Sequence, residues 1–306
     1  MDTMAHTPSI SLRDDFLTDS GFSTLIRLAL TEDGVWHDLT AQGLVPQSAT
    51  GRAEVRIKAE GVIAGLPLLA PRSPLMSAFP RVTTTCATVD GAKVAKGDIA
   101  ARLVGPARDL LALERTLLNF LQRMSGIATE TARYVTAVSG TRARIQETRK
   151  TAPGHRLSDK YAVAVGGGLN HRMGLHDAVL VKENHLAFAG VLRSPEAVRN
   201  AISILRGRIP RGRIIEVEVE TMDQFEAALE SGADIVMLDD MDPRDHIEAV
   251  RLRDARKSST LVEVSGGVTL DQVAAIAARG VDRISVGALT HSVKALDISL
   301  DMFPTP

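Results

Sequence analysis

Four short apolar runs in the last third of the chain decide the fold: RIIEVEVE (213–220), ADIVMLDD (233–240), TLVEVSGG (260–267) and DRISVGA (282–288). Their length and their Val and Ile content are typical of buried strands. Segments with helical spacing lie between them, each beginning near Thr or Asp as helix caps require: TMDQFEAALESG (221–232), DPRDHIEAVRLRDA (242–255) and TLDQVAAIAARG (269–280). Strand followed by helix, repeated, predicts a parallel α/β sheet.

Two earlier runs, ARIQETRK (143–150) and DAVLVKENH (177–185), extend the series, and a further helical segment follows at 194–207. The runs from 213 onward recur every 20 to 30 residues or so, a spacing that suits a TIM-type barrel of six to seven parallel strands. A doubly wound open sheet is the alternative.

The first half of the chain has a different rhythm. A helix is expected over 21–33, short strands with turn signals between them over 53–101, and long helical segments over 109–139. The short runs predict a small, mainly antiparallel sheet, in which Cys86 is a strand residue.

Composition is that of an ordinary globular protein. The chain has 306 residues, 44% of them hydrophobic, and a formal charge of -1, enough for one large domain or two moderate ones. No run of like charges points to nucleic acid, and no signal-peptide pattern or long apolar run points to a membrane. We therefore expect no nucleic-acid or membrane partner and a cytoplasmic location. A single cysteine excludes a disulfide within the chain.

The near-neutral net charge of the chain conceals two regions of opposite charge. Residues 142–182 hold eight Lys and Arg against three acids, whereas 216–242 hold ten carboxylates and no Lys or Arg. The first region is suited to carboxylates or phosphates, and the second to a divalent cation or sugar hydroxyls.

Polar residues fall where the predicted strands end, and in a barrel those ends share the face that carries active sites. They are Arg149, Lys150, Lys182, Glu218, Asp239, Ser265, Gly266, Gly267, Gly287 and Ala288. The glycines suit a backbone that approaches a phosphate. His171 and Arg172 could hold a carboxylate together, and His291 follows the last strand. The histidines lack the spacing of a zinc site.

The motifs also match a known family. ALTEDGVWHDLT, ERTLLNFLQRMSGIAT, TRKTAPGHR, GGGLNHRMGL, LVKENH, EVEVET, VMLDDM, EVSGGV and ISVGALTHS occur in that order along nearly the whole chain. The chain thereby resembles quinolinate phosphoribosyltransferase, also called carboxylating nicotinate-nucleotide pyrophosphorylase. The resemblance implies transfer of a phosphoribosyl group from phosphoribosyl pyrophosphate to quinolinate. Carbon dioxide and pyrophosphate leave, nicotinate mononucleotide forms for NAD biosynthesis, and Mg²⁺ is the cofactor.

The family fold implies an N-terminal open-faced α/β sandwich over 1–117 and an incomplete α/β barrel over 118–291, with 292–306 packing back on the sandwich. It also implies a homodimer in which Arg115 reaches the partner's site. The implied catalytic residues are Lys150, Lys182, Glu218 and Asp239, and the last two are the implied Mg²⁺ residues. The implied substrate-binding residues are Arg115, Thr148, Arg149, Lys150, His171, Arg172, Lys182, Glu218, Asp239, Ser265, Gly266, Gly267, Val286, Gly287, Ala288 and His291.

Three departures from the family pattern are expected near the site: His155 in place of an apolar residue, Glu183 in place of Asp, and Asp240 in place of Asn. Three alternatives stay open at this point. One is the molybdenum-associated paralogue of the same fold, and another is an aldolase-type barrel with Lys182 or Lys150 as Schiff-base lysine. The third is a binding protein without activity on an inherited fold.

Overall fold

The computed structural model describes residues 17–190 and 194–305. Backbone contacts divide them into two units. The sandwich unit comprises 17–132, 151–167 and 289–305, and the barrel unit comprises 133–150 and 168–288. The predicted boundary between residues 117 and 118 falls inside the long helix α4 (Ala107–Ala137), and the predicted domain limits stay a prediction.

The sandwich unit is built on an antiparallel sheet with the strand order β12-β1-β5-β3. These strands are β1 (Thr50–Ile57), β3 (Thr83–Cys86), β5 (Ile99–Pro106) and β12 (Ile298–Pro304), and β2 (Gly61–Val62) pairs separately with β4 (Lys93–Val94). Its helices are α2 (Ser20–Glu32), α3 (Leu39–Leu44), α5 (Arg156–Val165) and most of α4, and α11 (Ala288–His291) begins at its edge. The predicted antiparallel sheet is confirmed.

Alternating burial explains the central strand of this sheet. Ala53, Val55 and Ile57 are fully buried along β1, and the residues between them are more exposed. The C-terminal strand β12 pairs with β1 over seven residue pairs, from Gly51 with Pro304 to Ile57 with Ile298. The last strand of the chain therefore completes the sheet that β1 begins.

Close packing also fixes the three-glycine run that follows α5. A Cβ at Gly166 would lie 2.5 Å from the carbonyl oxygen of Ala128, so only glycine fits there. The end of α5 therefore lies close against the backbone of α4 at this glycine.

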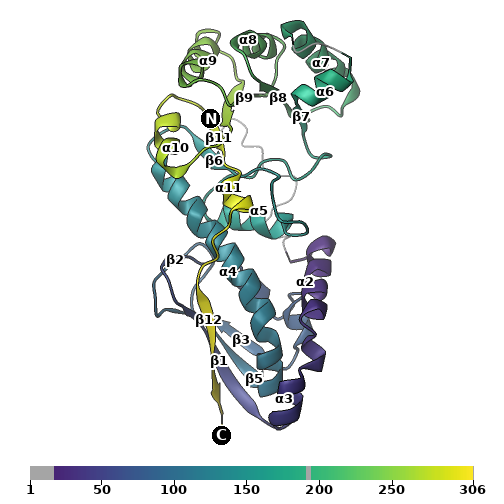
Figure 1. Ribbon diagram of the computed structural model, residues 1–306, viewed down its shortest axis with the longest axis vertical. Helices are drawn as coiled ribbons and strands as arrows, with labels where there is room; N and C mark the ends of the chain where they lie inside the picture. The colour runs from purple at the N-terminus through teal and green to yellow at the C-terminus, as the bar shows by residue number, and fades with distance from the viewer. Residues whose placement is uncertain (1–16, 191–193, 306) are drawn as a thin grey trace. The chain divides into compact units, whose positions relative to one another are not determined.

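The barrel unit holds six parallel strands in the order β6-β11-β10-β9-β8-β7. They are β6 (Arg144–Gln146), β7 (Val179–Val181), β8 (Ile215–Val219), β9 (Ile235–Asp239), β10 (Leu261–Ser265) and β11 (Arg283–Ser285). The connecting helices are α6 (Glu183–Phe188), α7 (Pro195–Arg208), α8 (Met222–Glu230), α9 (Pro243–Ala255) and α10 (Leu270–Ala277). Helices α7, α8 and α9 pack side by side along the outside of the strands (Figure 1).

The strand order distinguishes a barrel from a doubly wound sheet. Strands β7 to β11 follow one another without a reversal, and the last of them pairs with the first strand, β6. Among the described residues β6 and β7 do not pair, and a single parallel bridge from Gln146 to Leu169 extends the sheet beyond β6. The predicted incomplete barrel is confirmed, and the open-sheet alternative is wrong.

The helices begin where the sequence placed their caps. The side chains of Ser194, Thr221 and Asp242 accept backbone hydrogen bonds at the starts of α7, α8 and α9, and Thr269 forms a capping box with Gln272. In the described part of the chain, no helix combines the length and the apolar character that crossing a membrane would require.

The residue register places one set of side chains on a single face of the barrel sheet. Lys182 follows β7 beside Glu218, Glu218 pairs with Met237, and Met237 pairs with Glu263. Asp239 and Ser265 form the next level toward the carboxyl ends. Because strand side chains alternate between faces, the valines and leucines between these positions lie on the opposite face, on which the helices pack. The first face is polar, and it carries the candidate site.

Candidate active site

A cavity of about 330 Å³, called here the site cavity, opens at the carboxyl ends of the barrel strands. Its volume is that of a small-molecule site. It is lined by Thr148, Arg149, Lys150, His171, Arg172, Leu180, Lys182, Glu218, Met237, Asp239 and Ser265. All of these except Leu180 and Met237 were predicted as site residues. Segments far apart in sequence thus converge on one space within the barrel unit.

Lys182 and Glu218 form an ion pair at the centre of this lining. The carboxylate is almost buried, whereas the lysine side chain is 40% exposed. Burial raises the pKa of Glu218, and Lys182 opposes that rise by pairing with the ionised form. Asp239 and Glu183 raise the pKa further, because each adds negative charge nearby. Lysine and carboxylate therefore neutralise one another in this ion pair.

Arg172 provides a buried positive charge at the wall of the site cavity. Its Nη1 donates to the carbonyl oxygen of Ala178 at 3.0 Å, and its Nε has no hydrogen-bond partner among the described residues. Burial lowers the pKa of Arg172, and the positive charge of Arg149 lowers it further. Arginine keeps its proton in proteins, so the guanidinium is a largely desolvated cation, whose charge Glu216 and Asp177 partly offset.

A buried glutamate holds the segment that carries Arg172. Glu147, fully buried after β6, accepts a hydrogen bond from the backbone nitrogen of His171 at 3.0 Å and another from Asn170 Nδ2 at 3.0 Å. One carboxylate thus fixes two successive residues of the loop. Charge-assisted hydrogen bonds of this kind are stronger than neutral ones.

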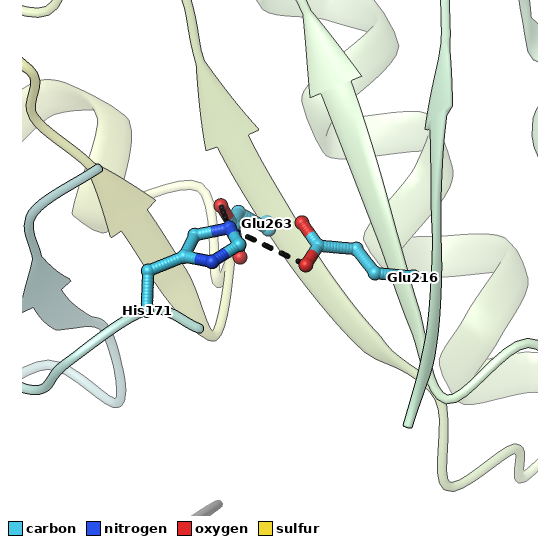
Figure 2. A group of neighbouring side chains, drawn as sticks. All are labelled: His171, Glu216 and Glu263. Carbon is cyan, nitrogen blue, oxygen red and sulfur yellow. Dashed lines mark ion pairs between the residues drawn. The ribbon is translucent and has the colours of Figure 1, made fainter. Parts of the chain in front are cut away.

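His171 is turned toward the barrel interior and uses both ring nitrogens there. Nδ1 accepts the backbone hydrogen of Arg172 at 2.7 Å. Nε2 lies 3.3 Å from Glu216 Oε2 and 3.8 Å from Glu263 Oε1, as Figure 2 shows. The ring lines the site cavity, and its predicted contact with substrate stays a prediction.

The Ser265, Gly266 and Gly267 loop is shaped by backbone geometry that suits glycine. Gly266 has φ 99° and Gly267 has φ 54°, and a Cβ at Gly266 would lie 3.0 Å from the backbone nitrogen of Asp240. Asp240 itself has φ 55°, a conformation that Asn and Asp tolerate better than other residues with a Cβ. Ser265 lines the site cavity, whereas the two glycines do not.

The other predicted site residues lie elsewhere. Val286 donates its backbone hydrogen to Gln146 at 2.9 Å, and Gly287 and Ala288 follow it at the end of the barrel unit. Arg115 and His291 belong to the sandwich unit. The Arg115 side chain is 56% exposed and lies 3.6 Å from Glu114 of its own helix. Neither Arg115 nor His291 is among the residues that line the site cavity.

Sequence reasoning gave no role to a buried polar group inside the barrel. Glu263 is fully buried, and its carboxylate accepts hydrogen bonds from Gln146 Nε2 at 2.7 Å and from Ser285 Oγ at 2.6 Å. Burial raises the pKa of Glu263 to about 7, and the charge of Glu216 adds to the rise. The sequence does indicate such a group: the glutamates in EVEVE (216–220) and LVEVS (261–265) interrupt strands that, in a parallel sheet, are ordinarily apolar throughout.

A second cavity lies in the sandwich unit and has the wrong charge for an anion. It measures about 480 Å³, and its lining includes Glu32, Asp33 and His155. Burial lowers the pKa of His155, and Arg123 lowers it further, so the ring favours its neutral form. The departure at His155 thus belongs to this second cavity. Glu183 begins α6 next to Lys182, and Asp240 follows Asp239, so these two departures adjoin the site cavity.

A cation-lined cavity at the strand ends of an incomplete parallel barrel defines an α/β-barrel enzyme that acts on an anionic substrate. Residues 38–125 match the profile of the N-terminal domain of quinolinate phosphoribosyl transferase, and residues 127–301 match that of its C-terminal domain. The chain belongs to the quinolinate phosphoribosyl transferase family.

Individual relatives are similar to this chain over most of their own length. The carboxylating nicotinate-nucleotide pyrophosphorylase of Mycobacterium leprae is 40% identical over 278 residues, which are 90% of this chain and 95% of the relative. The probable enzyme of that name from Bacillus subtilis is 40% identical over 272 residues, 89% of this chain and 90% of the relative. A solved nicotinate-nucleotide pyrophosphorylase from Francisella tularensis has a TM-score of 0.83 at 37% identity and covers 92% of this chain and 96% of its own.

Proposed function

We infer that the chain transfers the phosphoribosyl group of phosphoribosyl pyrophosphate to quinolinate, with decarboxylation, in NAD biosynthesis. The observation that carries this inference is the convergence of Arg149, Lys150, Arg172 and Lys182 on one cavity in a chain of this family. Quinolinate is a dianion, and a cavity with several cationic groups can bind both of its carboxylates. The family reaction and the cations of the site cavity both support a dianionic ligand.

In the proposed reaction, the cations orient the ring so that its nitrogen attacks C1 of the ribose. Pyrophosphate leaves from C1 with the electrons of the bond that breaks, and the ring nitrogen becomes quaternary. Carbon dioxide then leaves from the adjacent ring carbon, the positive ring stabilises the electron pair left on that carbon, and a proton from water adds there to give the product. Arg172 and Lys182 hold the substrate in place, an effect that can supply much of the rate enhancement.

We propose Mg²⁺ as the cofactor, held by Glu218 and Asp239 directly or through the substrate. Both side chains line the site cavity, and carboxylate oxygens are the ligands that Mg²⁺ prefers. When bound, the cation would neutralise the pyrophosphate that departs. Glu218 is paired with Lys182 in the substrate-free chain, so a substrate carboxylate that takes Lys182 would free Glu218 for this role.

The ion pair also bears on the aldolase-type alternative. A Schiff-base lysine attacks as the neutral amine, whereas a partner carboxylate stabilises the charged ammonium form. Lys182 is held by Glu218, and Lys150 lines the same anion-binding cavity. Both lysines are therefore better suited to binding an anion than to covalent catalysis.

The test is an assay of purified chain with quinolinate, phosphoribosyl pyrophosphate and Mg²⁺, followed by loss of quinolinate. Nicotinate lacks the carboxylate that departs and should be a poor substrate. Arg172→Ala and Lys182→Ala should each weaken quinolinate binding by about tenfold or more, because each removes a charge-assisted contact. Equal turnover of both acids, or wild-type affinity in either variant, would contradict the proposal.

We also propose a homodimer in which Arg115 completes the partner's site, which fits its exposed side chain in the sandwich unit. Mixing Arg115→Ala chains with Lys182→Ala chains should then restore activity, because each heterodimer holds one site with both native residues. Random exchange gives about half heterodimers with one working site of two, or about a quarter of wild-type activity. No recovery after exchange, demonstrated with two affinity tags, would place Arg115 outside the partner's site. The expected cytoplasmic location stays a prediction.

A further inference from the structure

Three buried side chains inside the barrel have the composition of a metal site. His171 comes from the loop after Asn170, Glu216 from β8 and Glu263 from β10, and their nearest ligand atoms all lie within 4.8 Å of one another. Figure 2 shows the two carboxylates directed at the imidazole from their strands. We call this group the interior cluster. Only His171 among the three lines the site cavity.

The hydrogen bond on the other side of the ring decides what the interior cluster holds. The backbone nitrogen of Arg172 lies 2.7 Å from His171 Nδ1, and a backbone N–H can only donate. Nδ1 is therefore without a proton, and the neutral ring carries its one proton on Nε2. Nε2 lies 3.3 Å from Glu216 Oε2 and 3.8 Å from Glu263 Oε1, so this proton is close to both carboxyl groups.

A metal ion would need the lone pair of Nε2, which the proton occupies. Histidines that bind metals through one nitrogen ordinarily donate a hydrogen bond from the other, and His171 accepts one there instead. Metal binding at Nε2 would require an imidazolate ring or loss of the bond to Arg172. The geometry favours a proton over a metal at this position.

Glu263 has the environment of a carboxyl group that keeps its proton up to nearly neutral pH. Glu263 is fully buried, and burial with the nearby charge of Glu216 raises its pKa to about 7. The hydrogen bond from Ser285 and the charge of Arg283 act in the opposite direction without cancelling that rise. Gln146 and Ser285 satisfy the Glu263 oxygens by hydrogen bonds whether or not a neighbouring cation is present.

We propose that Glu216 and Glu263 are positioning residues that hold His171 in its Nε2–H tautomer without a metal ion, and that His171 thereby fixes Arg172 at the wall of the site cavity. The bond from Arg172 N to His171 Nδ1 couples the two residues, and the bond from Arg172 Nη1 to Ala178 holds the other end of the side chain. The acids of the barrel interior thus set the position of a cation that faces the ligand. The identity of that ligand rests on the proposed function, but the tautomer does not.

The first test is spectroscopic and needs no substrate. Nitrogen-15 shifts of the imidazole, assigned by comparison with His171→Gln, distinguish the Nε2–H tautomer from imidazolium and from a metal-bound ring. We expect the Nε2–H tautomer at neutral pH, unchanged on addition of Zn²⁺ or Mn²⁺ at one equivalent, and retained in Glu263→Gln. Imidazolium, or a stoichiometric shift of the ring signals on addition of either metal, would overturn the proposal.

The second test measures quinolinate binding by calorimetry. Glu263→Gln keeps the shape and neutrality of the protonated acid, so its dissociation constant should stay within about threefold of wild type at neutral pH. Glu263→Leu removes the polar contacts and should raise that constant by about tenfold or more. Glu248→Gln, on exposed helix α9 of the same unit, is the matched control and should change nothing.

The two tests separate the possible failures. If wild type binds no quinolinate, the proposed function fails while the tautomer result still stands or falls by itself. If wild type binds quinolinate but Glu263→Leu keeps both the tautomer and the affinity, the positioning role is refuted. Circular dichroism of each variant shows whether it is folded, and Glu263→Gln, which changes few atoms, keeps the proposal testable if Glu263→Leu does not fold.

Discussion

The pH dependence of stability in Glu263→Gln gives a direct measure of the buried carboxyl. Glu263 is fully buried, and its pKa rises from an ordinary value of 4.5 to about 7. The glutamine side chain has nearly the same shape and does not titrate. Gln146 can turn its amide to suit the new group, because its Oε1 has no hydrogen-bond partner among the described residues.

The sign follows from where the proton is held. Between about pH 4.5 and about pH 7 the unfolded carboxyl has lost its proton while the folded one retains it, so unfolding releases a proton. Rising pH therefore favours the unfolded chain in this window. Below the window both forms are protonated and the group costs nothing, and above it the folded state bears the full cost of an ionised buried carboxyl.

The magnitude follows from the size of the shift. A rise from 4.5 to about 7, at 1.36 kcal/mol for each pKa unit, corresponds to roughly 3 kcal/mol. Glu263→Gln removes this dependence. Relative to wild type, its free energy of unfolding should increase by roughly 3 kcal/mol between about pH 4.5 and about pH 8, so the variant becomes the more stable of the two.

Urea denaturation of both proteins across this range is the assay. The difference between the two curves isolates Glu263 and its immediate neighbours, because titratable groups distant from it are common to both proteins and cancel in the subtraction. A difference that does not change with pH would show that Glu263 titrates as an exposed carboxyl does. A difference that moves in the opposite direction would show that the folded protein prefers the ionised form.

Two further substitutions test packing and buried charge by thermal or urea unfolding. Gly266→Ala should destabilise by about 1 to 3 kcal/mol, because φ 99° is strained for alanine and its methyl would lie 3.0 Å from a backbone nitrogen. Gly267 has φ 54° and open space around it, so Gly267→Ala should destabilise the chain less than Gly266→Ala. Equal losses of stability in the two variants would refute the steric argument. Asp159→Asn should cost about 3 kcal/mol, because the fully buried carboxylate binds Arg123 through two hydrogen bonds of 2.8 and 2.7 Å. The exposed ion pair between Glu248 and Arg251 provides the control, Glu248→Gln. If Glu248→Gln lost as much stability as Asp159→Asn, burial of the Asp159 carboxylate could not explain the loss.

The barrel could be predicted from the sequence because its strands and helices alternate in a regular series. The runs over 213–220, 233–240 and 260–267 contain β8, β9 and β10, and the cap residues lie where the helices begin. Strand ends on one face of a parallel sheet must converge, so the residues at those ends could be placed together without coordinates. The site cavity and its cations follow from the same rule.

Other features could not be predicted, because they depend on contacts between residues remote in sequence. The long helical region at 109–139 is one helix, α4, and no local signal separates one long helix from two shorter ones. Residues 151–167 adjoin the cation-rich strand end in sequence but belong to the sandwich unit. The interior cluster needs the register between β8 and β10 and the path of the loop at His171, which spacing along the chain does not specify.

The two regions of opposite charge are separate in sequence but interleaved in the structure. Lys182, from the cationic region, is paired with Glu218 of the acidic region, and His171 faces Glu216 of the same acidic run. In the proposed function, a substrate carboxylate that binds Lys182 would compete with Glu218, so the affinity would reflect the difference between two ion pairs. Such an exchange of partners would release the Glu218 carboxylate as the anion binds. It would thereby couple anion binding to the acid side of the site through one lysine.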